Sequence, residues 1–304
     1  LTREWKSMKS KAIKQSSQIK STRHFWWLFL LPVTAAFTIG FVWPFIQGIY
    51  LSFCKFKTIS SAKFIGLSNY ASAFADESFQ HSFWYTALTA IVCLVLINVI
   101  AFAVAYALTQ GIKGSNIFRT IFFAPNLIGG IVLGYVWKFI FNRAFVSIAS
   151  GVTGATVPSL LSTTQGAIFC LIFVSVWQYA GYMMLIYIAG FMSVDASLKE
   201  AALIDGCSSR QAMWHVTIPL MRSSFVTCIF LSTTRCFMVY DINLSLTNGE
   251  PFGSSVLAAM HVYRTAFTEK NYGVGQAEAL VLFIICAVIG LLQVYVGKKG
   301  EVEA

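Results

Sequence analysis

The chain consists largely of long segments that contain no charged side chain. These runs cover residues 25–54, 78–112, 120–137, 144–194 and 279–297. A helix needs about 20 apolar residues to cross the hydrocarbon core of a bilayer. The pattern predicts an all-α membrane protein with six spans, near residues 25–53, 83–109, 118–141, 166–192, 222–243 and 279–297. Arg235 interrupts the fifth of these spans.

Helices explain these segments better than barrel strands or a cleaved leader. A barrel strand alternates in polarity over about 10 residues, whereas residues 91–108 are almost continuously apolar. The first run is too long for the apolar part of a signal peptide, and it contains Pro32 and Pro44 in place of a small-residue cleavage site. We therefore expect the first span to be retained.

Composition narrows the class of protein further. Hydrophobic residues make up 57% of the 304 residues and charged residues 11%, against about 25% charged in soluble domains. This excludes a simple soluble enzyme and a disordered chain. The seven cysteines are odd in number and five lie in apolar runs, which favours small buried hydrophobes over a disulfide framework.

Basic residues predict the orientation in the membrane. If both termini are cytoplasmic, 14 of the 22 Lys and Arg residues lie on that side, seven of them in the tail at 1–24, and seven lie outside. The tail then faces the anionic leaflet, either along the interface or free in solution, and residues 298–304 form a second cytoplasmic tail. The tail at 1–24 has no interleaved aromatic residues beyond Trp5 and the spans dominate the chain, so the net charge of +10 does not predict a nucleic-acid partner.

The sequence lacks the motifs of the common catalytic and energy-coupling centres. It contains no G-x-x-x-x-G-K-[ST], no H-E-x-x-H and no G-x-S-x-G, and its four histidines have no metal-ligand spacing. The carboxylates Asp195, Asp241 and Glu278 lie at or near the ends of spans, whereas ion-coupled carriers usually need carboxylates within the membrane. We therefore expect no enzyme activity, no metal and no cofactor in this chain.

The polar segment 193–221, between the fourth and fifth spans, predicts two short helices joined at a corner. Asp195 can cap a helix over 196–204, and Gly206 can supply the left-handed residue that ends it. Ser208 and Gln211 have the spacing of a capping box for a second helix. Pro219 suits the first turn of the next span. An ordinary connecting loop is the alternative interpretation.

The same segment resembles the EAA loop of ABC-importer permeases. The matching residues are Glu200-Ala201-Ala202, Asp205-Gly206 and Val216-Thr217-Ile218-Pro219. Other segments resemble the carbohydrate branch of these permeases, namely Leu30-Leu31-Pro32, Tyr50-Leu51-Ser52-Phe53, Phe64-Ile65-Gly66-Leu67-Ser68-Asn69-Tyr70, Trp137-Lys138-Phe139-Ile140-Phe141-Asn142 and Thr247-Asn248-Gly249-Glu250-Pro251. The sequence departs from the pattern at Cys207, Met213 and Glu250.

The resemblance implies a function and a set of partners. It implies a permease subunit of a prokaryotic cytoplasmic-membrane importer, which passes a sugar or oligosaccharide delivered by an extracellular binding protein. A second permease, expected to be a different chain, would complete the path, and a dimer of ATPase subunits would supply the energy. The residues expected at the ATPase-coupling corner are Glu200, Ala201, Ala202, Asp205, Gly206 and Pro219.

The substrate path is expected among polar and aromatic residues of the third to fifth spans. Sugars are held by hydrogen bonds and aromatic faces, and the candidates are Asn126, Ser175, Trp177, Gln178, Tyr179 and Arg235. Hydrogen bonding between helices is the structural alternative for these polar residues. Pairing with Asp241 is the favoured role for Arg235, and a position on the path is the other.

The sequence pattern is also compatible with three other functions. A permease for another solute class in the same superfamily would share the EAA loop but would usually differ in the residues on either side of it. A secondary carrier would transport alone under an ion gradient, and a membrane scaffold would stimulate no ATPase.

Overall fold

The computed structural model describes residue 27 and residues 30–299, and nearly all of this region is helical. The basic segment 1–24 and the tail beyond residue 299 lie outside the described residues. The helices are α2 (Trp43–Ser52), α3 (Ser68–Ala75), α4 (Glu77–Thr109), α5 (Ser115–Leu127), α6 (Gly130–Phe139), α7 (Phe145–Thr153), α8 (Thr164–Ser193), α9 (Ala196–Ile204), α10 (Ser209–Ala212), α11 (Ile218–Leu220), α12 (Arg222–Phe237), α13 (Ala258–Tyr263) and α14 (Tyr272–Lys298).

Shorter elements connect or extend these helices. The π-helical turns are η1 (Thr38–Val42), η3 (Ile140–Ala144), η5 (Met213–Thr217), η6 (Asn243–Thr247) and η7 (Arg264–Thr268), and the 3₁₀ turns are η2 (Ile59–Ser61) and η4 (Leu160–Ser162). The strands β1 (Cys54–Lys55) and β2 (Lys63–Phe64) pair in antiparallel fashion, with Cys54 opposite Phe64.

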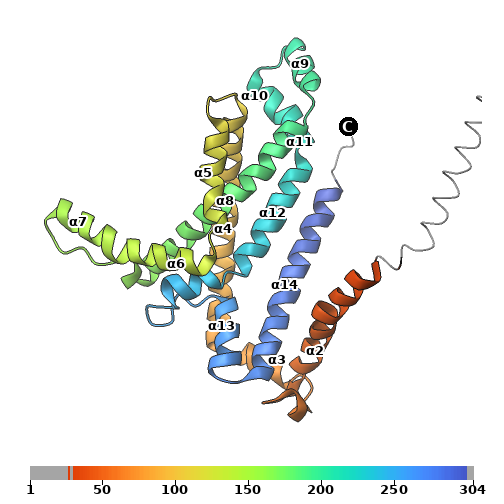
Figure 1. The fold of residues 1–304 in the computed structure, drawn as a ribbon, viewed down its shortest axis with the longest axis vertical. Helices are drawn as coiled ribbons and strands as arrows, with labels where there is room; N and C mark the ends of the chain where they lie inside the picture. Colours follow the sequence, from red (N-terminus) through yellow and green to blue (C-terminus); the bar gives the residue numbers. More distant parts are fainter. Residues whose placement is uncertain (1–26, 28–29, 300–304) are drawn as a thin grey trace, which may run out of the picture.

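Helices α4, α8 and α12 form the packed centre of the molecule (Figure 1). Their core includes Ile97, Met183 and Cys228, all fully buried. A polar chain also joins the three helices, because Tyr187 Oη donates to Asn98 Oδ1 at 2.8 Å and Asn98 Nδ2 donates to Ser232 Oγ at 2.9 Å. Such paired polar groups fix the register of helices that hydrophobic burial alone does not orient in lipid.

The third span is not the single helix that was predicted over 118–141. Helix α5 ends at Leu127, and the chain turns at Ile128 and Gly129 before α6 continues in another direction through η3 to α7 (Figure 1). Pro125 lacks an N–H and weakens the last turn of α5, and Gly129 adopts an extended conformation at the start of α6. A run without charged residues indicates hydrophobicity but does not reveal where a helix changes direction. The prediction of one helix over 118–141 was therefore wrong.

The fifth span is also shorter than expected. Helix α12 ends at Phe237 and not near residue 243. The helical segments 209–220 and 222–237 meet at Met221 with a bend of 68°. In the described part of the chain, five helices are long and apolar enough to span a membrane, or up to six if this bent pair counts as one.

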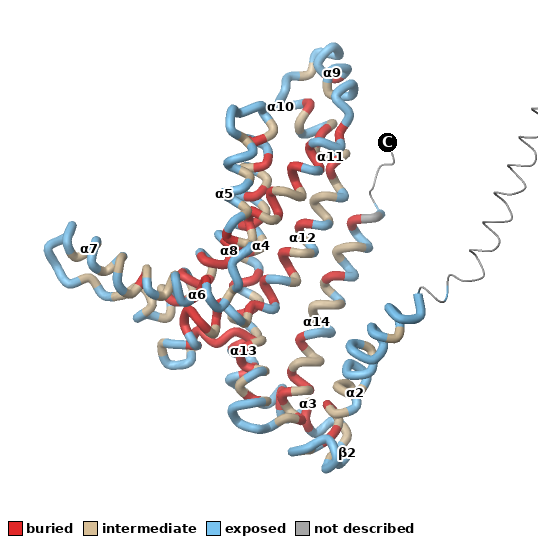
Figure 2. Tube along the Cα trace, in the orientation of Figure 1, coloured by how far each residue is buried: buried red, intermediate tan, exposed pale blue. Residues whose placement is uncertain are grey.

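The two ends of the molecule differ in structure. One end carries α9 and α10, and the opposite end carries α3, α13 and the β1–β2 ladder (Figure 1). There Asn69 Nδ2 donates to the carbonyl oxygens of Ser52 and Cys54 at 2.8 and 2.9 Å, which fixes α3 against the end of α2. Many residues of α5, α7 and α14 are exposed (Figure 2), and they include large apolar ones such as Ile121, Ile148 and Leu291. Exposed apolar surface of this extent requires lipid or a partner protein to cover it.

Helices α5 and α8 approach each other closely at Gly181. A Cβ atom at this position would overlap the carbonyl oxygen of Phe122. Gly181 is therefore required by backbone proximity between the two helices, as is typical of small residues at membrane-helix interfaces.

We predict that Gly181→Ala lowers the free energy of unfolding by about 1–3 kcal/mol, because the backbones must separate. Gly151→Ala in α7 is the matched control, since a Cβ there meets no neighbouring atom. Thermal unfolding of the detergent-purified variants checks this. Equal unfolding temperatures for the two variants would contradict the proposed close packing.

Candidate functional site

The helix α9 begins at the predicted cap. Asp195 Oδ1 accepts from the backbone N–H of Ser197 at 2.9 Å. This bond stabilises the carboxylate form and holds the pKa of Asp195 below its ordinary value. Because the folded-state pKa is lowered, the contribution of this cap is present above the ordinary pKa of an aspartate and is lost as the pH falls through the folded-state value.

The end of α9 is closed by a glycine corner. Gly206 has φ +86°, a left-handed conformation that glycine adopts without strain. The N–H of Gly206 bonds the carbonyl of Leu203 at 3.1 Å, and the N–H of Cys207 bonds that of Ala202 at 3.0 Å. This pair of bonds is a Schellman motif, which satisfies the last carbonyls of the helix. The predicted corner is therefore confirmed as a local structure.

The second helix, α10, starts with the predicted capping box. The backbone N–H of Gln211 donates to Ser208 Oγ at 3.3 Å, and Gln211 Oε1 accepts from the backbone N–H of Ser208 at 2.8 Å. Pro219 lies in the first turn of α11, ahead of the bend at Met221. In this two-helix element, which we define as residues 195–221, both ends of α9 and the start of α10 thus have their own hydrogen-bond partners.

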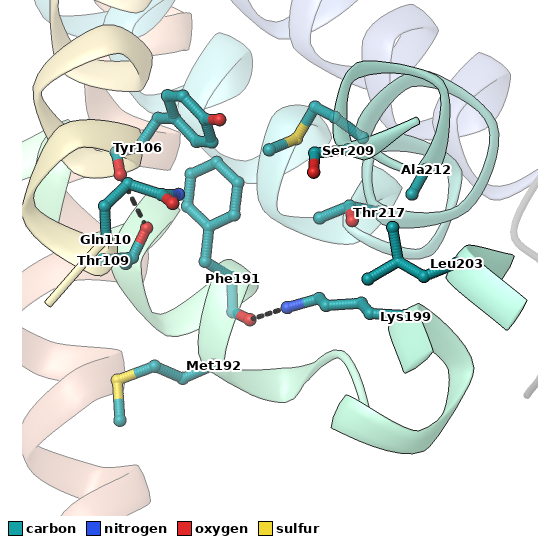
Figure 3. Close-up of a pocket in the computed structure, with 11 residues that line it drawn as sticks. Tyr106, Thr109, Gln110, Phe191, Met192, Lys199, Leu203, Ser209, Ala212 and Thr217 are labelled. Atoms are coloured by element: carbon teal, nitrogen blue, oxygen red, sulfur yellow. Dashed lines mark hydrogen bonds between the residues drawn. The ribbon is translucent and has the colours of Figure 1, made fainter. Parts of the chain in front are cut away.

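A cavity of about 300 Å³ separates the two-helix element from the ends of the long helices (Figure 3). Tyr106 of α4, Gln110 directly after α4 and Phe191 of α8 line one side of the cavity, and Lys199 and Leu203 of α9 line the other. Lys199 Nζ donates to the carbonyl oxygen of Phe191 at 3.4 Å (Figure 3). This bond joins the two-helix element to α8, and the cavity leaves open space between the element and the ends of α4 and α8.

The six predicted coupling residues differ in exposure. Glu200, Ala201, Asp205, Gly206 and Pro219 are exposed, whereas Ala202 is buried within the chain itself. The apolar side chains of Ile204 and Trp214 are 85% and 62% exposed. The exposed surface thus combines charge, small residues and large hydrophobic groups, which suits contact with another protein.

A second cavity, of about 320 Å³, lies where α5 breaks into α6 and faces α8 and the end of α12. It brings together four of the six predicted path residues, namely Asn126, Gln178, Tyr179 and Arg235. The other two lie elsewhere: Ser175 is buried in the bundle, and Trp177 packs edge-on against Trp137 with ring centroids 5.3 Å apart. Asp241, which was predicted only as a partner for Arg235, also lines this cavity, and so does the backbone of Ile128–Gly130, which sequence reasoning missed.

Arg235 does not form the ion pair with Asp241 that was favoured from sequence. Its guanidinium lies over the rings of Tyr179 and Tyr182, 5.2 and 5.4 Å from their centroids. Among the described residues, the ion pairs within 4.0 Å involve only His261. Two tyrosine faces on a neighbouring helix provide an alternative partner for the cation, and sequence spacing gave no indication of this.

Two amide oxygens of this cavity have no partner. Gln178 Nε2 donates to the carbonyl oxygen of Ile128 at 3.0 Å, which satisfies the broken end of α5. Gln178 Oε1 and Asn126 Oδ1 are buried without a hydrogen bond. Buried unpaired acceptors are costly, and a hydroxyl-bearing ligand would satisfy them.

The fold also collects residues that the sequence left scattered. His261 lies between Asp76 and Glu278, and the three can offer donor atoms within 4.8 Å of one another. Glu278 is fully buried although it lies near the start of α14. The three residues come from separate segments, so no local motif could have predicted their proximity.

A polytopic helical protein with an exposed, capped two-helix corner at one end has the architecture of a membrane component of a transporter. The profile of the binding-protein-dependent transport system inner membrane component family matches residues 109–300. The chain belongs to this family, and it is a multi-pass membrane transport subunit.

Individual relatives agree with this assignment. The chain is 40% identical over 278 residues to the probable starch degradation products transport system permease protein AmyD of Thermoanaerobacterium thermosulfurigenes, covering 91% of this chain and 95% of that protein. It is 30% identical to the multiple sugar-binding transport system permease protein MsmF of Streptococcus mutans, covering 93% and 99%.

The fold also matches that of a solved transporter. A chain of a bacterial ABC transporter involved in the import of the acidic polysaccharide alginate superposes with a TM-score of 0.79 at 18% identity, covering 93% of this chain and 99% of that chain. At this identity the match concerns the fold alone.

Proposed function

We propose that this chain is the permease subunit of an ABC importer that passes a sugar or oligosaccharide across the cytoplasmic membrane. An extracellular binding protein delivers the substrate, a second permease completes the path, and partner ATPases supply the energy. The observation that carries this proposal is the capped corner at Gly206, which lies within the segment matched by the family profile. The sugar transport named for the 40% and 30% identical relatives supports the substrate class.

The orientation forms part of the proposal. Lys199, Arg210 and Arg222 lie in or next to the two-helix element, and basic residues favour the cytoplasmic side. The described end of α14 lies toward the same end of the molecule as α9 (Figure 1). Both arguments support a cytoplasmic two-helix element and a cytoplasmic C-terminus. We place the N-terminus on the same side because of the seven basic residues in segment 1–24.

Rigidity is the property that the two-helix element contributes. ATP-driven motion arises in a partner, so force must cross a protein interface, and a loop without fixed structure would absorb it. The Asp195 cap, the Schellman corner and the Ser208–Gln211 box hold the element in one shape. We infer that the docking surface consists of Glu200, Ala201, Asp205 and Gly206. Ala202 is buried and packs inside the element. Pro219 lies in the first turn of α11, close to the end of the element at Met221.

The cavity at the α5–α6 break is the proposed segment of the substrate path in this subunit. Gln178 and Asn126 offer amide oxygens to sugar hydroxyls, and Tyr179 offers an aromatic face to a sugar ring. A solute with an acidic group is the second candidate, because Arg235 contributes a positive charge with no carboxylate within 4.0 Å among the described residues. Competition of uptake by neutral and acidic sugars separates the two candidates.

The coupling role predicts a selective defect for Gly206→Val. Valine at φ +86° forces the corner out of shape, and a strain of about 1–2 kcal/mol per residue corresponds to roughly a tenfold loss of coupled uptake. The measurement is uptake and binding-protein-stimulated ATP hydrolysis by the reconstituted transporter. Gly206→Asn is the matched control, because asparagine tolerates the left-handed conformation, and it should retain most of the activity. Wild-type uptake by the valine variant would refute the coupling role.

The path role predicts that Gln178→Ala raises the KM for uptake by about tenfold, since one hydrogen bond to substrate contributes about 1–1.5 kcal/mol. Gln293→Ala is the control, because Gln293 Nε2 also makes one bond, to Thr233 Oγ1 at 2.9 Å, and its Oε1 is also unpartnered, but it lies outside the cavity. Concentration-dependent uptake by both variants provides the comparison. Equal KM values would reduce Gln178 to a structural residue.

A further inference from the structure

A buried carboxylate near the end of the molecule that carries α3 and α13 has no conventional cationic partner. The side chain of Glu278 is 0% exposed, and its Oε1 atom has no hydrogen-bond partner. Among the described residues, no Lys or Arg lies within 4.0 Å of it, and its one charged contact is with His261. A buried charge is costly unless it is paired or coordinates a metal ion.

The atoms around His261 Nδ1 are spaced as metal ligands. Glu278 Oε2 and Thr265 Oγ1 each lie 3.4 Å from Nδ1. These separations exceed those of charge-assisted hydrogen bonds, about 2.7–2.9 Å. They equal the separation of about 3.4 Å between two ligand atoms that each lie about 2.1 Å from a tetrahedrally coordinated ion.

The other ring nitrogen of His261 faces a second carboxylate. Asp76 Oδ2 lies 3.6 Å from Nε2. A metal-binding histidine usually donates its free ring N–H to a carboxylate, which fixes the tautomer and the ring orientation. Asp76 is itself held at the start of α4, where its Oδ1 accepts from the backbone N–H of Ser78 at 2.8 Å.

Of these four residues, His261 lines a cavity of the structure. A cavity of about 610 Å³ has His261 in its wall, together with Glu77, His81, Arg264 and Glu269. Glu77, Ser78, His81 and Glu269 are exposed residues of this wall, whereas His261 is buried. Thr265 and Glu278 are also buried, and they do not line the cavity.

We propose that His261 Nδ1, Glu278 and Thr265 bind a divalent metal ion of the zinc type, with Asp76 orienting the imidazole ring from the other side. The imidazole nitrogen and the carboxylate oxygen are donors that Zn²⁺ takes in proteins, and the hydroxyl of Thr265 and a water fill the remaining positions. Because the ligands belong to α13, η7 and α14, the ion fastens three consecutive segments at this end of the molecule. The inference stands apart from the proposed transport function.

The test uses the assembled transporter with its affinity tag removed and Zn²⁺ as the probe. Bound zinc is counted by mass spectrometry after equilibration in micromolar Zn²⁺, and affinity is measured by competition with a chromophoric chelator. We expect Glu278→Gln and His261→Gln each to bind one zinc fewer per chain than the wild type. The controls Glu269→Gln and His81→Gln, which alter residues of the same cavity wall, should bind as many as the wild type.

A milder variant keeps the proposal testable if the buried substitutions unfold the protein. Asp76→Asn preserves the helix cap, because asparagine caps as well as aspartate, and should weaken zinc affinity about 10- to 100-fold. Zinc should also raise the unfolding temperature of the wild type and not that of Glu278→Gln. Equal zinc content in the wild type and Glu278→Gln would overturn the site and leave a hydrogen-bonded histidine in its place.

Discussion

In hydrocarbon, every backbone N–H and C=O group must find its partner within the protein, and the irregular parts of this chain depend on that constraint. Where α5 gives way to α6, the exposed carbonyl of Ile128 accepts a hydrogen bond from Gln178 on α8. Beyond α12, Asn243 donates to the carbonyl of Ser255 and accepts from the N–H of Leu257. At both of these departures from straight helix a polar side chain satisfies the freed backbone groups, and the polar cavity at the α5–α6 break follows from the first of them.

The features that were predictable from sequence are those set by local chemistry. Long apolar runs predict α4, α8 and α14 because hydrophobicity is a property of the run itself. The caps at Asp195 and Ser208 and the corner at Gly206 were equally predictable from the sequence, since each depends on residues within one or two turns. Such local signals describe an element without reference to the rest of the fold.

The features that sequence did not predict depend on contacts between distant segments. The break at Ile128 is stabilised by a residue 50 positions later, so the run 118–141 looked like one helix. Arg235 lies on the rings of Tyr179 and Tyr182 and not beside Asp241, because α8 and α12 pack together there. His261 and Glu278 are 17 positions apart in the sequence, and the packing of α13 against α14 places His261 Nδ1 3.4 Å from Glu278 Oε2.

Some parts of the molecule are held in one shape by hydrogen bonds, and others border open space. This combination suits a subunit that hydrolyses no ATP itself and transmits motion from its partners. The two-helix element is internally fixed by its caps and has a cavity beneath it, and the bundle of α4, α8 and α12 connects it to the polar cavity near α6. In the proposed account, the element moves as one body when the partner ATPases close, and the helices carry that movement to the substrate path.

The most direct test of this account is sugar uptake by the chain reconstituted in liposomes, alone and with its second permease, ATPases and binding protein, in the presence and absence of ATP inside the liposomes. The account predicts accumulation against a gradient only when all the partners and ATP are present. Accumulation by this chain alone under an ion gradient would contradict it.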